Sequence, residues 1–357
     1  MCAYGSLEGE GVERRNRPPL SNAPLLGPVG DFRFIVSFFI WACKSKMRLV
    51  VGAKGFIGRR LLGTGDRALV RSRAGLPCEV VGDLLDPASL ATACQDVATV
   101  FHCAGFAHAV GTIDAQAHWR INFEGTRNLV DAAGQAGVRR FIFLSSVKAM
   151  ADPGRASADE DWPGVPTTPY GQAKRAAEEA VLEAGARYGM HVVNLRLAMV
   201  YGRGGRGNLQ RMAQGMRAGW FPPLPETGNR RSLVHVDDVV AVLRLVAERP
   251  EANGRTYIVA DPQAYSGRQI QEAIHAVLHR QTGRWAIPEG LLRTGGRWGD
   301  RLEGWLRRPL PLNSAVIARL LDSECYAPTR LERELGWRAR IGLMEGLREM
   351  LGDEASV

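Results

Sequence analysis

From Met47 onward, short apolar runs alternate with longer segments in which apolar residues recur every three or four positions. The short runs predict strands, and the longer segments predict amphipathic helices. Strands that alternate with helices across short connections form a parallel sheet covered on both faces. The pattern therefore predicts an α/β fold with a Rossmann-type doubly wound sheet. We expect strands at 48–51, 68–71, 79–81, 99–102, 140–144 and 192–197, and helices at 57–62, 86–95, 115–136 and 170–188.

The pattern changes after Tyr201, where the sequence becomes irregular and rich in glycine and proline. A helix near 236–247 and a strand at 256–259 are expected to return to the sheet, and the remainder from Asp261 is mostly helical in pattern. We therefore predict a Rossmann domain at 47–200, to which 235–260 returns. Residues 201–234 and 261–357 are expected to form a smaller, mostly helical substrate-binding domain.

The first 46 residues differ in character from the rest. Residues 1–31 are polar, rich in glycine and proline and without periodicity, so we expect them to be disordered. A ten-residue apolar run at 34–43 is too short to span a bilayer, and no convincing signal-peptide cleavage site follows it. Because Met47 opens a strand that leads into a glycine-rich turn, we interpret 1–46 as an extension upstream of the natural start. The alternative is a peripheral membrane anchor.

Composition narrows the class of protein. Hydrophobic residues make up 45% and charged residues 23%, as in ordinary globular proteins. No apolar run reaches the roughly 18–20 residues of a membrane-spanning helix, so we expect no stable membrane insertion. The six cysteines include no C-x-x-C pair, which argues against a zinc site or a disulfide framework and favours a reducing, cytoplasmic location. His275 and His279 have helical spacing without other ligands near them in sequence, so we interpret them as surface residues and expect no metal site.

The chain is basic. Its 46 Lys and Arg residues exceed its 37 Asp and Glu residues by nine, which predicts an anionic partner: a phosphorylated small molecule, nucleic acid or an acidic membrane surface. Residues 280–340 alone hold twelve Arg against seven acidic residues. These arginines are dispersed and lack regularly spaced aromatic residues, so we interpret this stretch as a basic surface and expect no nucleic-acid binding.

A glycine motif lies between the first strand and the first helix. The sequence G-A-K-G-F-I-G places Gly52, Gly55 and Gly58 there, with Phe56 and Ile57 between the last two glycines. Glycine permits a tight turn and lets backbone N–H groups approach a pyrophosphate closely. In this strand–turn–helix context the motif predicts a dinucleotide-binding site.

The residues after the second strand select between NAD and NADP. An acidic residue there binds the ribose hydroxyls of NAD, but this chain has Arg71 and Arg73. An arginine can pair with the 2′-phosphate of NADP, so we favour NADP over NAD. The alternative is that both arginines are simply solvated.

Two further strand ends carry candidate cofactor contacts. Asp83 and Leu84 follow the third strand, where the Asp83 carboxylate is a candidate partner for the adenine amino group; the alternative is an ordinary loop aspartate. Ala104 follows the fourth strand, and a small residue there lets the backbone approach the cofactor ribose. His102, at the end of that strand, is interpreted as a core residue.

Tyr170 and Lys174 are predicted to carry the chemistry. Four residues apart on a helix, they share one face. An ammonium beside a phenol favours the phenolate and lowers its pKa from about 10. The pair is therefore a candidate general acid/base for an alcohol–ketone conversion. Ser146 ends the fifth strand and is expected to hydrogen-bond the substrate oxygen, with Ser145 as the alternative because one residue of register separates them.

The order of these motifs resembles the extended short-chain dehydrogenase/reductase family, specifically its NAD-dependent epimerase/dehydratase branch. The resemblance runs from Met47 almost to the C-terminus. It is closest to UDP-hexose 4-epimerases and 4-keto-sugar reductases. Further segments that carry it are N-F-E-G-T-R-N-L at 122–129, Y-G at 201–202, R-G-N-L at 206–209, N-R-R-S-L-V at 229–234, R-S-L-V-H-V-D-D at 231–238 and L-G-W at 335–337.

The resemblance implies a function. It implies bound NAD(P), a nucleotide-diphosphate sugar as substrate and a homodimer formed through a four-helix contact. Tyr170 would move the hydroxyl proton, Ser146 would orient the oxygen and Lys174 would hold the cofactor ribose. The reaction would be hydride transfer at a sugar carbon, C4, in a 4-epimerase or a 4-keto reductase.

The resemblance also assigns residues to the substrate diphosphate. Asn208 and Arg231 would contact it, and a guanidinium offers a fork suited to phosphate. The alternative for Arg231 is a brace against Asp237 or Asp238. The alternative for Asn208 is an ordinary loop residue.

Some positions depart from the family pattern. Leu197 stands where the family has proline, and Arg203 stands where proline follows Y-G. Val147 and Lys148 stand where sugar dehydratases carry Asp-Glu beside the active-site hydroxyl, so dehydration is not expected. Two other functions stay open: a dehydrogenase or reductase of a non-sugar alcohol, sterol-like or flavonoid-like, and a non-catalytic NADP-binding sensor. Such sensors generally lack the Tyr–Lys pair.

Overall fold

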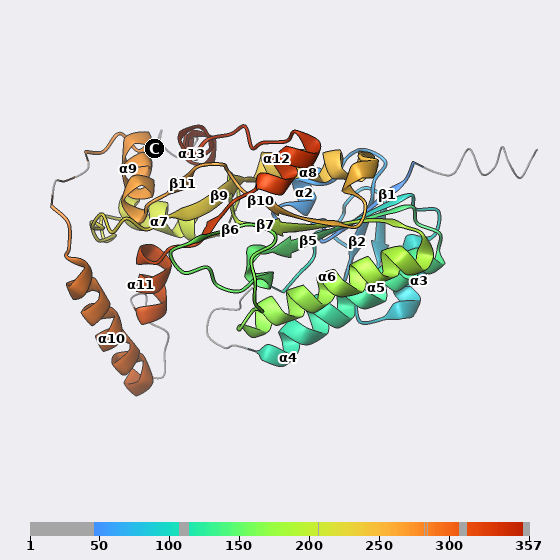
Figure 1. The fold of residues 1–357 in the computed structure, drawn as a ribbon, viewed down its shortest axis with the longest axis horizontal. Helices are drawn as coiled ribbons and strands as arrows, with labels where there is room; N and C mark the ends of the chain where they lie inside the picture. The colour runs from blue at the N-terminus through green and yellow to red at the C-terminus, as the bar shows by residue number, and fades with distance from the viewer. Residues whose placement is uncertain are drawn as a thin grey trace, which may run out of the picture. The chain divides into compact units, whose positions relative to one another are not determined.

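A seven-stranded parallel sheet forms the centre of the structure (Figure 1). The computed structural model describes residues 46–106, 114–205, 207–281, 283, 285–306 and 313–352, so the expectations for residues 1–45 lie outside the described residues. The strand order is β3-β2-β1-β4-β5-β7-β10. The strands are β1 (Arg48–Val51), β2 (Arg67–Val70), β3 (Glu79–Val81), β4 (Thr99–His102), β5 (Arg140–Ser146), β7 (His191–Leu197) and β10 (Arg255–Val259).

The strand order confirms the predicted doubly wound Rossmann-type sheet. From β1 the chain builds outward through β2 and β3, and it then returns to pair β4 on the other side of β1. The order therefore reverses between β1 and β4. In such sheets ligands bind beyond the carboxyl ends of the strands at this point.

Helices cover both faces of the sheet, and the pleat assigns each apolar side chain to one of them. In β1, Val50 packs in a core with α8 (Val236–Glu248) on one face. Leu49 and Val51 pack in a second core on the opposite face, under three other helices. These are α3 (Pro87–Cys94), α5 (Gly125–Gln135) and α6 (Pro169–Tyr188).

The predicted helix at 115–136 is interrupted in the structure. It consists of α4 (Ala115–His118), a π-helical segment η1 (Trp119–Glu124) and α5. The Asn122 side chain exchanges hydrogen bonds with the backbone of Phe106, at 2.8 Å and 3.0 Å. The widened turn places this side chain against the loop after β4, a tertiary contact that the apolar periodicity does not encode.

The first helix and the second strand also differ slightly from the prediction. Helix α2 (Gly58–Leu61) has only four residues, and β2 begins at Arg67 and ends at Val70. Arg71 therefore lies just beyond the strand, at the position that selects the cofactor.

A C-terminal lobe packs around its own core. It contains a three-stranded sheet of β8 (Met199–Tyr201), β9 (Arg231–His235) and β11 (Ala264–Tyr265). Its helices are α7 (Asn208–Arg217), α9 (Gly267–Val277), α10 (Glu289–Leu306), α11 (Ser314–Leu321) and α13 (Leu343–Leu351). This confirms the mostly helical C-terminal region. No helix in the described part of the chain is long and apolar enough to cross a membrane.

Two elements tie the lobe to the central sheet. Strand β12 (Cys325–Tyr326) pairs with β6 (Ser157–Ala158), which follows the short 3-10 helix η2 (Val147–Ala149). Helix α12 (Thr329–Leu335) packs on the sheet itself, where Leu331 and Leu335 join the core around α8. The domain boundaries stay a prediction, but this helix of the 261–357 segment covers the Rossmann sheet.

Candidate active site

The glycine motif forms a tight turn at the carboxyl end of β1. Gly52 has a φ of 85°, and a Cβ atom there would lie 2.7 Å from the backbone nitrogen of Ala104. A Cβ at Gly58 would overlap the carbonyl oxygen of Gly52, and one at Gly55 would lie 3.0 Å from the same oxygen. The three glycines therefore allow a close turn with exposed backbone, which fits a pyrophosphate.

Phe56 and Ile57 occupy different sides of this turn. Ile57 packs against the core around α8. The guanidinium groups of Arg59 and Arg60 lie 5.8 Å and 5.9 Å from the centroid of the Phe56 ring. A Cβ at Gly205 would lie 3.1 Å from the same ring, so the turn abuts the loop after β8.

The candidate adenosine contacts surround the ends of β2 and β3. Arg71 is exposed, and its side chain has no ion pair or hydrogen bond to the described residues. Asp83 is also exposed, and its Oδ1 accepts a hydrogen bond of 2.9 Å from the Leu85 amide. The Leu84 carbonyl accepts from the Asn128 side chain at 3.0 Å, which holds the loop against α5.

The end of β4 is buried and uncharged. The Nε2 of His102 lies 2.9 Å from the Thr126 hydroxyl, which donates to the Asn122 carbonyl. Burial, reinforced by the charge of Lys174, lowers the pKa of His102 to about 3, so this side chain is neutral. The structure places His102 in the core beneath Phe141 and Phe143, where the sequence interpretation had put it.

Tyr170 and Ser146 meet at the start of α6. Thr168 caps this helix, and its hydroxyl accepts from the Gly171 amide at 3.1 Å. The Ser146 hydroxyl lies beside the Tyr170 phenol, where it lowers the pKa of that group. Ser145 points the other way, because neighbouring residues of a strand face opposite sides of the sheet, and it donates to Glu178 at 2.5 Å. Of the two predicted alternatives, Ser146 is therefore the serine that faces Tyr170.

Lys174 lies one turn further along α6 and is buried. Its Nζ donates to the Leu144 carbonyl at 2.9 Å and lies 4.6 Å from the centroid of the Phe143 ring. A Cβ at Gly105 would lie 3.3 Å from the same Nζ. Burial lowers the pKa of Lys174 to about 8.

The expected effect of Lys174 on Tyr170 is not what the structure shows. Burial raises the pKa of Tyr170 above its usual value, while the neighbouring Ser146 hydroxyl lowers it by a smaller amount. The ammonium is directed to the Leu144 carbonyl, and desolvation of the phenol dominates. The structure therefore gives a raised Tyr170 pKa where the sequence analysis expected a lowered one, and the effect of Lys174 on Tyr170 stays a prediction.

Two residues around this site were missed by the sequence analysis. Asn122 binds the loop after β4 and borders the same space as Lys174, since a Cβ at Gly105 would lie 3.3 Å from both side chains. Glu178 is buried, pairs with Arg196 at 2.7 Å and accepts from Ser145. The sequence did contain a signal for Glu178, because it lies four residues after Lys174 and therefore on the same helix face as Tyr170 and Lys174.

The predicted diphosphate residues lie in the C-terminal lobe. Asn208 is exposed at the first position of α7. Arg231 is buried in β9; its Nη2 lies 3.0 Å from Glu324, and its Nη1 donates to the Asp322 carbonyl at 3.1 Å. Glu324 also pairs with Lys148 at 2.5 Å, two residues after Ser146. The ion pairs thus connect β9 to the serine end of β5.

The alternative brace for Arg231 against Asp237 or Asp238 was wrong. Asp237 pairs with Arg60 at 2.6 Å, and Asp238 accepts from the backbone amides of Arg340 and Ile341. Strand β9 runs directly into α8, so these carboxylates lie beyond the other end of the strand from Arg231.

Comparison with known proteins identifies the family. Residues 48–260 match the family model described as NAD dependent epimerase/dehydratase family. The chain belongs to this family. It is 27% identical to UDP-glucose 4-epimerase of Vibrio cholerae over 324 residues, which are 85% of this chain and 94% of that protein. It is 31% identical to sterol demethylase protein B of Methylococcus capsulatus over 313 residues, 81% of this chain and 92% of that protein.

A solved structure supports the same family. MoeE5 in complex with UDP-glucose and NAD is 25% identical and matches with a TM-score of 0.65 over 85% of this chain and 97% of that chain. These findings confirm the resemblance to the extended short-chain dehydrogenase/reductase branch. They support an NAD(P)-dependent enzyme of this type.

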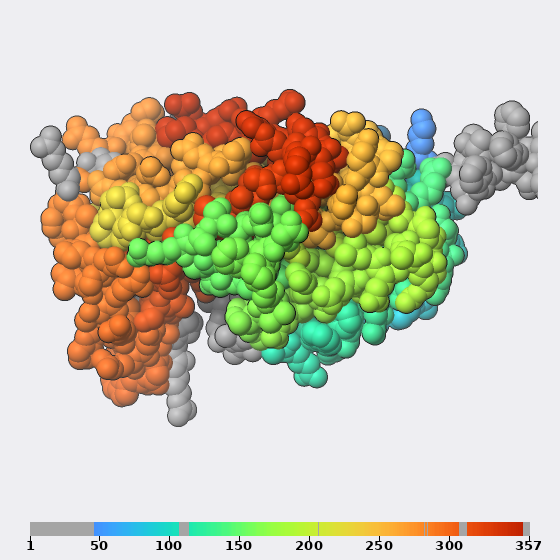
Figure 2. Space-filling model, in the orientation of Figure 1, coloured from blue at the N-terminus to red at the C-terminus, as the bar shows by residue number. Residues whose placement is uncertain are grey.

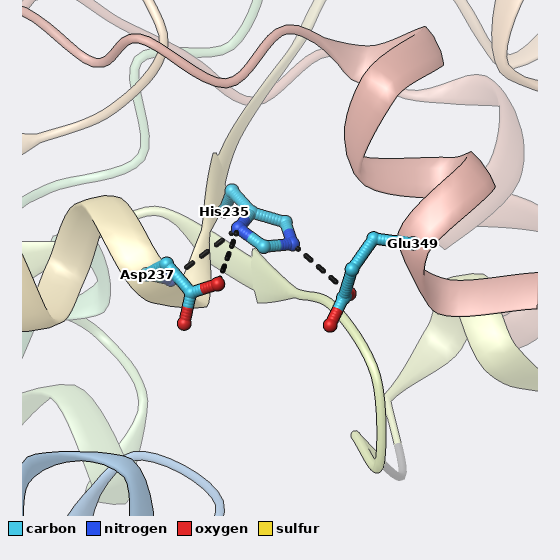
Figure 3. A group of neighbouring side chains, drawn as sticks. All are labelled: His235, Asp237 and Glu349. Atoms are coloured by element: carbon cyan, nitrogen blue, oxygen red, sulfur yellow. Dashed lines mark hydrogen bonds and ion pairs between the residues drawn. The ribbon is translucent and has the colours of Figure 1, made fainter.

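One cluster of potential metal ligands lies in the described part of the chain, away from Tyr170. It consists of His235, Asp237 and Glu349 (Figure 3). Arg60 donates to both carboxylates, at 2.6 Å to Asp237 and 3.2 Å to Glu349. The His235 Nε2 lies 3.3 Å from Glu349, and its Nδ1 accepts from the Asp237 amide. The Arg60 guanidinium compensates part of the charge of these carboxylates, so we interpret the cluster as an ion-pair network that joins α2, α8 and α13. The absence of a metal site stays a prediction.

Proposed function

We propose that this enzyme transfers a hydride at C4 of a nucleotide-diphosphate sugar, as a 4-epimerase or a 4-keto reductase. The observation that carries the proposal is the neighbouring pair of Tyr170 and Ser146, with Lys174 one turn deeper on the same helix. A bound nicotinamide would supply the hydride chemistry. The tight glycine turn at the end of β1 fits its pyrophosphate.

In this proposal Tyr170 moves the proton of the sugar hydroxyl. Its raised pKa keeps the phenol protonated at neutral pH, which suits the donor role when a ketone is reduced. Ser146 orients the same oxygen from the end of β5. Lys174 is buried with three N–H donors, and among the described residues its hydrogen-bond acceptor is the Leu144 carbonyl. It would donate its remaining hydrogens to the cofactor ribose.

Two cations would contact the diphosphate. Arg231 uses two of its N–H groups on Glu324 and Asp322, and a guanidinium has five, so donors remain for a phosphate oxygen. Lys148 shares Glu324 and lies beside the Ser146 end of β5. Asn208 would add a contact from the start of α7.

We further propose NADP as the preferred cofactor and a homodimer as the assembly. Arg71 lies one residue beyond β2, exposed and without an ion pair to the described residues, which suits a 2′-phosphate. The dimer would form through α5 and α6, which lie side by side (Figure 1).

Tyr170→Phe tests the assignment, because it removes the phenolic proton and retains the ring. We expect turnover to fall by at least about a thousandfold, within the range of general acid/base effects, while NAD(P)H binding followed by fluorescence stays unchanged. Tyr188→Phe, near the end of the same helix, is the matched control and should keep normal activity. Substantial turnover by the Tyr170→Phe variant would refute the proposal.

A sterol-like alcohol is the second candidate substrate. The relative from Methylococcus capsulatus, named sterol demethylase protein B, favours it. The same Tyr170 and Ser146 would act on a ring hydroxyl. Turnover of UDP-sugars and of 3-hydroxysteroids by the same preparation distinguishes the two, since the proposal expects activity with the nucleotide sugars only.

A further inference from the structure

Helix α10 carries a largely exposed apolar stripe, whose side chains belong to none of the hydrophobic cores of the described residues. Leu291, Trp298, Leu302 and Trp305 are 64%, 64%, 45% and 79% exposed. Their spacings of seven, four and three residues place them on one face of the helix. In Figure 1, α10 extends from the end of the C-terminal lobe beside α11, and Figure 2 shows its surface at the margin of the lobe.

The stripe is not the face that anchors the helix. Leu292 is buried in the core of the lobe, and a Cβ at Gly296 would lie 3.1 Å from the Cα of Ser314 in α11. Residues 292 and 296 point more than about 100° away from residue 298 around a helix of 3.6 residues per turn. The helix is therefore held by one face and presents a second apolar face to its surroundings.

Acidic and basic side chains of α10 lie on different sides of the stripe. Asp300 accepts from the Ser314 amide and Glu303 from the Asn313 side chain, both at 2.9 Å, so these carboxylates face the start of α11. Arg297 and Arg301 are exposed and have no ion pair to the described residues. The Arg301 guanidinium lies 5.3 Å from the centroid of the Trp298 ring, at the border of the stripe.

From this arrangement we propose that α10 docks the enzyme on an anionic membrane surface. Tryptophan and leucine would enter the boundary between headgroups and acyl chains, and the two arginines would contact lipid phosphates. The net charge of +9 complements such a surface. A helix that lies in the plane of the interface needs no membrane-spanning segment, and the described residues contain none.

Vesicle flotation of the full chain tests the proposal. We expect binding to vesicles of phosphatidylglycerol mixed with phosphatidylcholine, and weaker binding to phosphatidylcholine alone or at high salt. Trp298→Ala combined with Trp305→Ala should weaken binding by about tenfold for each tryptophan, because each buries an apolar side chain worth about 1.4 kcal/mol or more. Trp119→Ala, at an exposed tryptophan of η1, is the matched control and should bind as the parent protein does.

Charge reversal supplies a second variant. Arg297→Glu combined with Arg301→Glu should weaken binding to the anionic vesicles by about fivefold for each charge, with little effect on phosphatidylcholine. All these side chains are exposed, so melting temperatures should be unchanged. Equal vesicle binding by the parent and both double variants would overturn the proposal. The proposal would also be overturned if the parent protein did not bind vesicles but self-associated through α10. Sedimentation would show this as an oligomer of the parent protein that the tryptophan variant does not form.

Discussion

Arg231→Ala is the sharpest test of a diphosphate substrate. The Arg231 side chain is buried, and two of its N–H groups donate hydrogen bonds, one to the Glu324 carboxylate and one to the Asp322 carbonyl. Its remaining donors are the ones that we assign to the substrate. The substitution therefore removes two things at once, an ion pair within the protein and a proposed contact with phosphate, and each has its own measurable effect.

The two effects have similar sizes. A hydrogen bond to a charged group contributes about 1.5–3 kcal/mol, so loss of a phosphate contact should raise KM about ten- to a hundredfold. Loss of the pair with Glu324 should lower the free energy of unfolding by about the same amount, moderated because Lys148 still pairs with that carboxylate. Affinity for the cofactor should be nearly unchanged.

The assay measures KM for a panel of nucleotide sugars together with the melting temperature. Arg230→Ala is the matched control, because Arg230 is adjacent and exposed and should alter neither quantity. Arg231→Lys should recover the charge but not the two-pronged geometry, and it should rescue KM in part. A lower melting temperature with an unchanged KM for every nucleotide sugar would refute the diphosphate contact and favour the sterol-like alternative.

Three further outcomes are expected. Arg71→Glu should weaken NADPH binding more than NADH binding in fluorescence titrations, because it sets a carboxylate against the 2′-phosphate; equal losses would make Arg71 an ordinary surface residue. Gly58→Ala should weaken binding of either cofactor more than Gly55→Ala does, because its Cβ meets the Gly52 carbonyl at closer range; the reverse order in the same titration would contradict the assigned turn. Burial lowers the pKa of Lys174 from 10.5 to about 8, so the unfolded chain binds more protons between those values and the stability from this residue should rise with pH there. Urea unfolding of the parent and of Lys174→Met across that window should show the unfolding free energy of the parent rising with pH relative to that of the variant, and parallel pH profiles would contradict it.

Much of the architecture could be predicted from the local pattern of apolar and polar residues. Alternating apolar runs and helical periodicity depend on backbone geometry that repeats over a few residues, so they predicted the parallel sheet before any contact was known. The glycine motif and the four-residue spacing of Tyr170 and Lys174 are equally local. Together they predicted a dinucleotide fold, which the family match confirms. The assigned roles of the individual site residues stay predictions.

What the sequence left open depended on contacts between distant segments. The choice between Ser145 and Ser146 required the register of β5 against α6, because a shift of one residue reverses the face of a strand. Arg231 pairs with Glu324, which lies 93 positions later in the sequence. No local sequence pattern around either residue predicts this pair. Burial, which sets the pKa values of Tyr170 and Lys174, is a property of the whole packed core.

For the exposed stripe of α10, too, the sequence predicts the helix, while the tertiary structure decides which of its faces is buried. An amphipathic pattern has the same period whether its apolar face enters a core or meets the surroundings, so the sequence by itself determined that 289–306 can form such a helix. Only the tertiary structure decided that Leu292 and Gly296 anchor it while Trp298 and Trp305 stay exposed. The physical reason is that periodicity is fixed by the geometry of one helix, whereas burial depends on which other segments fold against it.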